Sequence, residues 1–369
     1  MKMPPIRLHI SCLALFLSLF SAVGQDMPAL GVAEEIKRGA FPNGLEYYLV
    51  SNQAEKGFAD FALVTKTPAD ESAARDLLDS LPHFGGRAPY RFLADNGVGY
   101  SREGYVVSRP DARILSLRRV PVYNTDVADS TLMLIFDVAA SSDAPQAVIV
   151  SGDIDVAKVR ERMDLLSMTV PKLGRQADTA VYRWAPRDSL RIIVTYNSTE
   201  DVAAINAIFS ARRLPAALMN TIQPLIADAY SYILGRIVSV RLEDAFRRQG
   251  IPLAQMHFDY HDSAESSGDE YYSFSLFTSA ECIDGATSAL ASVFASLDKN
   301  GATVEEFEDA KQRMKSEVKR SEFGRRLSNR EYVEKCAASY LYGANLASET
   351  SVNRYIMGRS LPVDRELSL

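Results

Sequence analysis

The spacing of apolar residues predicts alternating strands and helices in the first half of the chain. Residues 45–50 and 58–65 are apolar runs of strand length, and the turn signal Phe41-Pro42-Asn43-Gly44 precedes the first of them. Apolar residues then recur at positions 74, 77, 78 and 81, which is the spacing of one helix face. The other elements expected here are strands at 113–120 and 147–150, a helix face over 127–138, and a helix that Asp155 caps.

A second half repeats this order after a linker-like stretch rich in Pro, Gly and Arg at 171–187. A strand is expected at 191–197, and the region 202–246 indicates a long helical stretch interrupted by Pro215 and Pro224. The other elements expected are a strand at 271–277, a helix face over 289–297, and a helix with the face Phe307, Ala310, Met314 and Val318 behind the capping box at 303–306. The pattern predicts an α+β fold of two similar domains, each an antiparallel-rich sheet covered by helices, at 30–170 and 188–345, with a tail at 346–369.

The first 24 residues have the pattern of a secretory signal peptide. Lys2 and Arg7 precede an apolar run from Leu8 to Phe20, and the small residues at 21–24 suit cleavage after Gly24. This apolar run is short for a transmembrane helix. We therefore expect an exported protein, periplasmic or extracellular, with no membrane span in the mature chain.

Composition narrows the classes of function. The chain has 369 residues, 47% of them apolar and 24% charged, which is typical of a folded protein. Its 41 basic and 47 acidic residues give a formal charge of -6, and nucleic-acid binding needs a basic surface instead. Outside the signal segment only Cys282 and Cys336 remain, so at most one intramolecular disulfide is possible, and their apolar surroundings favour buried free thiols.

Four short motifs occur in a fixed order. They are the turn Pro42-Asn43-Gly44-Leu45, the strand 147–150 followed by Gly152-Asp153, the segment Arg241-Leu242-Glu243-Asp244, and the segment from Gly301 to Phe307 with Ala310-Lys311 behind it. In order and spacing, over residues 41 to about 342, they resemble the insulinase or pitrilysin family of zinc peptidases. The resemblance implies paired α+β domains that act on polypeptides.

Catalysis in that family depends on an H-x-x-E-H helix, in which two His bind zinc and the Glu acts as base. Alignment on Phe84 and Gly86 places the two His positions at Leu77 and Leu81 and the Glu position at Ser80. Leucine has no lone pair for a metal, and an isolated serine hydroxyl is a poor base. The resemblance therefore implies a degenerate relative without metal or cofactor.

Two rearranged metal sites stay open as alternatives. A shifted register offers Asp79 and His83 as ligands, although Pro82 would break the helix between them. Alternatively, His257, Asp259 and His261 would share one side of a strand. A zinc endopeptidase built from His83, His257 and His261 is thus the alternative reading.

Other departures from the family pattern also favour the loss of zinc-dependent peptidase activity. The segment with the third zinc ligand is missing between 138 and 147, and Phe246 and Leu253 stand where an Arg and a Tyr hold the substrate backbone. Cys336 lies in an apolar pattern typical of core rather than of a nucleophile. We expect a non-catalytic protein that binds a polypeptide or serves as partner to another insulinase-family subunit. A truncated remnant of a longer enzyme is a third reading.

Overall fold

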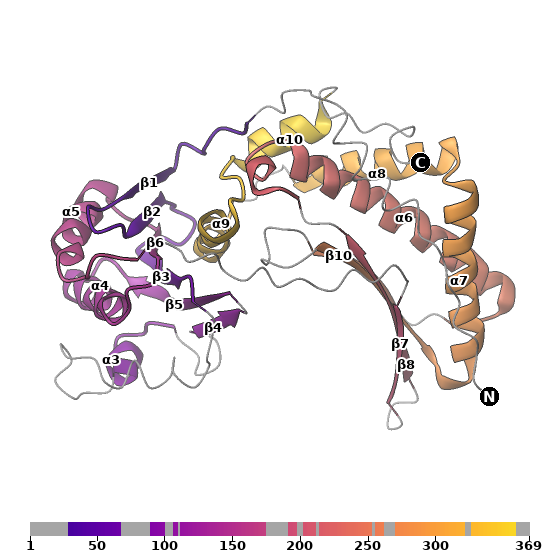
Figure 1. Ribbon diagram of the computed structural model, residues 1–369, viewed down its shortest axis with the longest axis horizontal. Helices are drawn as coiled ribbons and strands as arrows, with labels where there is room; N and C mark the ends of the chain where they lie inside the picture. The colour runs from indigo at the N-terminus through magenta and orange to yellow at the C-terminus, as the bar shows by residue number, and fades with distance from the viewer. Residues whose placement is uncertain are drawn as a thin grey trace. The chain divides into compact units, whose positions relative to one another are not determined.

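The computed structural model describes residues 29–67, 89–99, 106–109, 111–174, 191–197, 202–211, 214–252, 255–261, 270–321 and 326–358. They fall into two compact units. The described residues of the first unit lie within Leu30–Tyr182 and Arg325–Ser348, and those of the second lie within Arg183–Gly324 and Glu349–Leu369, together with Ala29. Both units combine a sheet with packed helices, so the α+β prediction is confirmed (Figure 1).

The first unit contains a six-stranded mixed sheet in the order β1-β2-β6-β3-β5-β4. Strands β2 and β6 run parallel, and the other neighbouring pairs are antiparallel. The strand β3 has the predicted bounds, and β2, β5 and β6 lie within two residues of the predicted runs. The strands are β1 (Ile36–Ala40), β2 (Glu46–Ser51), β3 (Phe58–Thr65), β4 (Val106–Arg109), β5 (Ala112–Pro121) and β6 (Gln146–Gly152).

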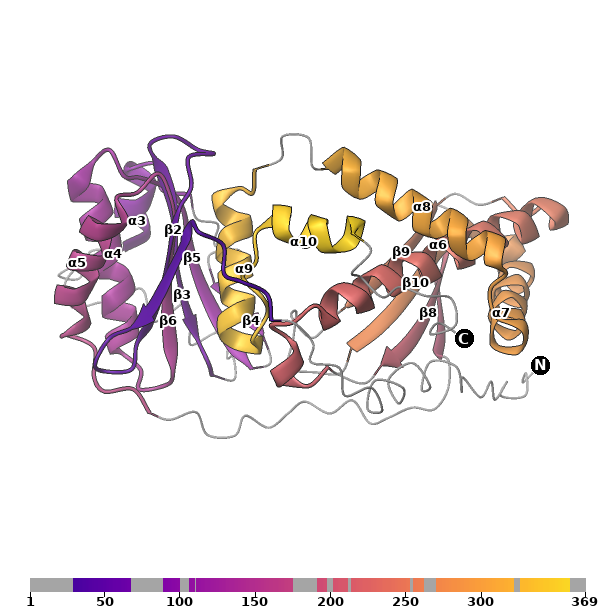
Figure 2. The ribbon, with the colours of Figure 1, turned by 90° about the horizontal axis from the view of Figure 1, so that it is seen from above.

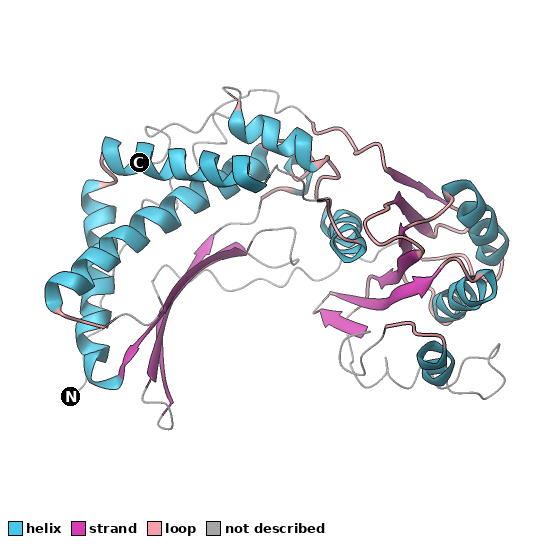
Figure 3. Ribbon diagram, turned by 180° about the vertical axis from the view of Figure 1, so that it is seen from behind, coloured by secondary structure: helices cyan, strands magenta, loops and turns pink. Residues whose placement is uncertain are grey.

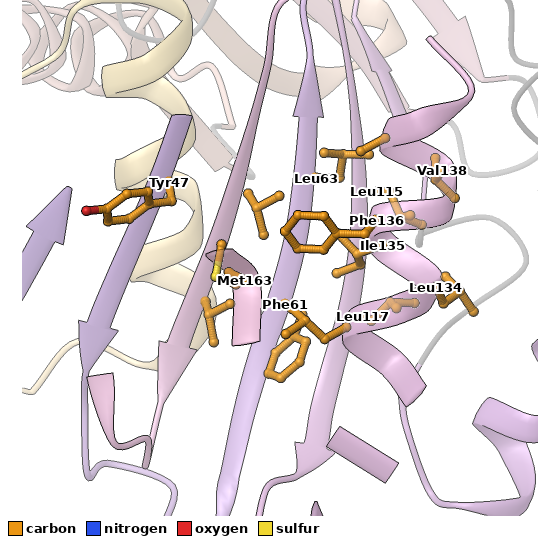
Figure 4. Close-up of a cluster of buried hydrophobic side chains, with 14 of the residues drawn as sticks. Tyr47, Phe61, Leu63, Leu115, Leu117, Leu134, Ile135, Phe136, Val138 and Met163 are labelled. Atoms are coloured by element: carbon orange, nitrogen blue, oxygen red, sulfur yellow. The ribbon is translucent and has the colours of Figure 1, made fainter. Parts of the chain in front are cut away.

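Helices cover one face of this sheet in the way that the sequence predicts. Helix α4 (Thr125–Ala140) and helix α5 (Val156–Ser167) pack against it, and the short helix α3 (Pro89–Asp95) adds Leu93 to the same core. The apolar side chains of α4 reach across to Leu63 and Leu115 of the sheet (Figure 4). Asp155 caps α5 as expected, because its carboxylate accepts hydrogen bonds from the backbone N–H groups of Ala157 and Lys158.

The other face of the first sheet is covered by helix α9 (Asn329–Tyr342), which lies far away in the sequence (Figure 2). Its apolar stripe packs on Tyr48, Val50 and Ile149 of the sheet. The stripe consists of Val333, Cys336, Ala337 and Tyr340. The sequence predicts a second domain over 188–345, but this helix belongs to the first unit, because the sheet would otherwise expose an apolar face.

Buried polar contacts fix the start of α9 on the sheet. The Asn52 amide donates to the Asn329 side chain at 2.9 Å and to the Leu327 carbonyl at 3.0 Å. Asn329 is fully buried and donates in turn to the Phe58 carbonyl. Ser328 caps the helix and forms a capping box with Glu331. Buried amides that satisfy one another in this way allow one register of the helix on the sheet.

The second unit contains a four-stranded antiparallel sheet in the order β7-β8-β10-β9. Helices lie on one side of it (Figure 3). The strands are β7 (Arg191–Asn197), β8 (Val202–Ala211), β9 (Gln255–His261) and β10 (Glu270–Ser279). The helices are α6 (Gln223–Gln249), α7 (Ile283–Asn300), α8 (Val304–Ser321) and α10 (Glu349–Met357), with the short 3-10 turns η3 (Ala216–Leu218) and η4 (Ala280–Cys282).

One prediction for the second half is wrong. Residues 202–211 form strand β8 rather than helix, because Ala203, Ile205, Ala207 and Phe209 alternate inward against the helices. The alanines suggest a helix locally, but the period of two is satisfied only in a sheet. The helix α6 instead begins at Gln223, with Pro224 in its first turn, and ends at Gln249, where Gly250 caps it with a φ of 65° that suits glycine. Part of the expected tail forms helix α10.

Three of the predicted segments lie wholly or mostly outside the described residues, whereas the prediction for the cysteines can be compared with the structure. The signal segment 1–24, the helix face 74–81 and most of the linker 171–187 are not described. Cys282 and Cys336 are both free, and burial raises the pKa of the Cys336 thiol to about 12, as expected for a core side chain. Within the described residues no helix is long and apolar enough to cross a membrane.

An ion pair joins two segments of the second unit that carry family-like motifs. Arg241 of α6 contacts Glu306 through two hydrogen bonds of 2.6 and 2.8 Å and also donates to the Gly301 carbonyl. Glu306 completes the predicted capping box, since it accepts from the Thr303 N–H. The bonds from Arg241 are the main cause that lowers the pKa of Glu306 to about 2.

We expect the change Asn329→Ala to lower the free energy of unfolding by about 1–3 kcal/mol, because it removes buried partners of Asn52 and of the Phe58 carbonyl. Chemical denaturation followed by circular dichroism measures this. The matched control is Glu334→Ala on the same helix, which removes only an exposed pair with Arg330. Equal effects of the two changes would contradict the anchoring role of Asn329.

We expect the Glu306–Arg241 pair to stabilise the fold above the unfolded pKa of Glu306, near 4.5, and to lose this contribution as pH falls toward its folded pKa of about 2. Denaturation curves between pH 2.5 and 6 should show Glu306→Gln to be destabilised by roughly 2 kcal/mol near pH 6 and by progressively less in acid. Asp309→Asn, at an exposed pair with Arg313, is the control. A difference that does not change with pH would refute the assignment.

Candidate functional site

The positions that decide catalysis in the resembling family lie outside the described residues. Leu77, Ser80, Leu81 and His83 all fall within 68–88. The structure describes the flanks of this segment, where β3 ends at Thr65 and α3 begins at Pro89. The loss of the zinc motif therefore stays a prediction from sequence, and so does the shifted register through Asp79 and His83.

Strand β9 places His257, Asp259 and His261 on one face, as the sequence predicts. The register with β10 sets them opposite Ser275, Ser273 and Tyr271 in turn. His257 and Asp259 are exposed, and His261 is half-buried because its ring stacks on Tyr271 with a centroid distance of 4.2 Å. This face points away from the helices of the second unit, since the alternate residues of β9 pack toward them.

The strand geometry is unfavourable for one metal ion shared by the two histidines. Residues four apart on a strand are separated by about 13 Å, so the imidazoles of His257 and His261 converge poorly on a single tetrahedral ion. Among the described residues, no three His, Cys, Asp or Glu side chains lie close enough to hold a metal. The third member of the alternative set, His83, lies outside those residues.

The opposite side of β9 is apolar and is positioned by a glycine. Phe258 and Met256 pack on the core of the second unit, and Phe258 also contacts the rings of Tyr272 and Phe274. A Cβ at Gly235 of α6 would overlap the Phe258 ring, so only glycine lets the helix come this close to the strand. Since β9 lies at the edge of the sheet, Met256, Phe258 and Tyr260 remain half-buried.

A buried carboxylate holds the end of β9 in place. Glu270, only 3% exposed, accepts a hydrogen bond of 2.8 Å from the Tyr260 hydroxyl and one of 3.1 Å from the Leu214 N–H. Burial is the main cause that raises the pKa of Tyr260 well above its ordinary value, and Tyr272 and Glu270 raise it further. The phenol therefore stays protonated and keeps donating to Glu270.

The face of the second sheet opposite its helices mixes polar and apolar residues and carries little charge. Ala204, Asn206 and Ile208 of β8 and Ser273 and Ser275 of β10 are half-buried there. The Ser275 hydroxyl donates to the Asn206 side chain at 2.7 Å. Asp259 is the acidic group on this face among the described residues of β8, β9 and β10. Helices cover only the other side (Figure 3).

Sequence reasoning missed two residues that position this strand. Glu270 reads as part of an acidic loop, and only its place in the first position of β10 shows that it is buried. Gly235 lies inside a helix pattern, where an isolated glycine suggests a close approach but not its partner. Of the two expected family positions, Phe246 is a core residue of α6, and Leu253 is not described.

Comparison with solved structures identifies the fold, whereas comparison with sequences finds no relative. No protein-family model matches the chain, and no curated protein matches it. The first half of the periplasmic protease PqqL from Escherichia coli superposes with a TM-score of 0.71 at 12% identity, over 92% of this chain and 89% of that one. An insulinase-family protease predicted in Yersinia pestis gives 0.68 at 12% identity, over 94% and 91%.

A peptidase M16 inactive domain from Pseudomonas fluorescens gives a TM-score of 0.61 at 14% identity, over 90% of this chain and 93% of that one. Against the whole of PqqL the chain covers 46% of the length, so it corresponds to one half of the larger enzyme. These identities establish the fold alone. The chain therefore has the α+β fold seen in one half of PqqL, in an insulinase-family protease and in an M16 domain described as inactive.

Proposed function

We propose that this chain is a non-catalytic, exported protein with an insulinase-family fold that binds extended polypeptide segments at the edge strand β9. The geometry of β9 carries the proposal. It is an edge strand, with an exposed polar face on one side and a half-buried apolar face on the other. An added strand would continue the sheet through main-chain hydrogen bonds.

The side chains of β9 define what such a segment would contain. Successive residues of an added strand alternate between the two faces of the sheet. One set would lie beside Met256, Phe258 and Tyr260, which suits apolar or aromatic residues. The other set would lie beside His257, Asp259 and His261, where a basic residue opposite Asp259 gains a favourable pair.

The non-catalytic part of the proposal comes from the residues at the family's ligand and base positions. Leu77, Ser80 and Leu81 offer neither zinc ligands nor a base. Export is supported by the signal-like segment 1–24. The partner can be a free polypeptide or a strand of another insulinase-family subunit, since both present the same extended backbone.

We expect purified protein, residues 25–369, to contain less than about a tenth of an equivalent of zinc after dialysis without chelator, because Leu77 and Leu81 cannot bind the ion. A site with proper ligands would retain its zinc through this dialysis. We also expect no cleavage of unfolded peptides. Elemental analysis and a peptide digest read by mass spectrometry measure the two. About one equivalent of zinc, lost together with activity in His257→Ala, would establish the zinc endopeptidase instead.

We expect the change Asp259→Lys to weaken binding of an extended peptide with alternating apolar residues and a central Lys by about fivefold, because attraction becomes repulsion across the strand pair. The same change should strengthen binding of the matched peptide with a central Glu. Fluorescence anisotropy measures both. Asp284→Lys makes the same charge change on the exposed start of α7 and is the control. If both variants shift binding equally, the site is not at β9.

A further inference from the structure

Three edge strands, β1, β7 and β9, differ in how they discourage pairing with other chains. Natural proteins place charges, prolines or bulges on exposed edges. Edge strand β1 exposes Lys37 and Arg38, and edge strand β9 exposes His257 and Asp259. Edge strand β7 has the sequence RIIVTYN, with one charged residue at its first position and no proline or glycine. The middle of β7 therefore has no charge or proline that would discourage pairing with another strand.

The middle of β7 is exposed on both faces of the sheet. Val194 pairs with Ile205 of β8, so it points toward the helix side, yet it is 43% exposed. Ile193 pairs with Asn206, points toward the uncovered side, and is 36% exposed. Thr195 is exposed as well. Helices α6 and α7 pack over the inward residues of β8 and β10, which leaves the helix side of β7 uncovered at Val194.

We propose that β7 pairs antiparallel with β7 of a second copy of this chain, so that two four-stranded sheets join into one across a two-fold axis. Among the described residues β7 pairs only with β8, so its other edge has no described strand beside it and is the edge available to a further strand. Pairing over the full strand places the axis at its central residue, Val194, and sets Ile193 opposite Thr195 of the second copy.

The strand is self-complementary in this arrangement. Two valines meet at the axis, and each flanking pair joins an isoleucine to a threonine, which are β-branched residues that suit a sheet. The single charged position, Arg191, falls opposite Asn197, so the two arginines lie at opposite ends of the pairing. A charged ligand strand would find a charged partner on β7 only at Arg191, whereas a second copy places uncharged residues opposite the uncharged positions 192–196.

The size of the contact predicts a weak dimer. A pairing of seven residues on each side is smaller than the interface of a stable complex, so association should appear at roughly 10–500 µM. Sedimentation velocity of the full mature chain over this range measures it. We expect the weight-average mass to rise toward twice the monomer value for the wild type.

Charge changes at the axis test the geometry. Val194→Lys and Val194→Glu each place like charges opposite one another, so each variant alone should stay monomeric over the whole range. A 1:1 mixture sets Lys opposite Glu and should restore the dimer. This rescue occurs only if residue 194 of one copy meets residue 194 of the other. Far-UV circular dichroism and melting temperature confirm that both variants fold.

The matched control is Leu165→Lys, which changes a residue that is 63% exposed on α5 of the first unit. It should dimerise as the wild type does. A wild type that stays monomeric to 500 µM, a dimer that survives Val194→Lys, or a mixture that fails to pair would each overturn the proposal. The result is independent of peptide binding at β9, because Val194 lies on the opposite edge of the sheet.

Discussion

The first sheet depends on the burial of both its faces. Strand β6 is buried along its whole length, which is typical of a strand covered on two sides. Helices α4 and α5 cover one face, and they follow the strands closely in the sequence. Helix α9 covers the other, and its anchor pair, Asn52 and Asn329, is 277 residues apart. The first unit is therefore complete only when the chain returns to it after the second unit.

The second sheet differs from the first, because helices cover only one of its faces among the described residues. Its core lies between β8, β10 and the helices α6 and α7. On the opposite face Asn206, Ser273, Ser275 and His261 are half-buried, and the Ser275 hydroxyl donates to the Asn206 side chain, which lowers the cost of burying this pair. Both edges of this sheet also remain unpaired among the described residues.

Local signals in the sequence predicted most of the individual elements. The strand β3 agrees to the residue, Asp155 caps α5, and the capping box at Thr303 and Glu306 forms. What failed needed information from distant residues. Strand β8 contains helix-favouring alanines, and only pairing with β7 and β10 decides its period. The assignment of α9 to the first unit, and the burial of Glu270, depend on the same kind of contact.

The residues that carry the family resemblance have structural tasks. Gly44 has a φ of 92°, which suits glycine, and the Asn43 amide donates to the carbonyls of Ser167, the last residue of α5, and of Val170. A Cβ at Gly152 would overlap Ala59 and the Phe58 carbonyl, and Asp153 accepts from the Gly57 N–H at 2.9 Å.

The second-unit motifs follow the same principle, because Arg241 in one of them binds Glu306 in the other. Such residues are required for the backbone to close its turns and to join its helices, whether or not a zinc ion is bound. A resemblance built from them therefore identifies the fold and leaves the chemistry to other positions. The sequence predicts that Leu77, Ser80 and Leu81 occupy those positions, and the proposal that the chain lacks zinc-dependent hydrolysis rests on these three residues.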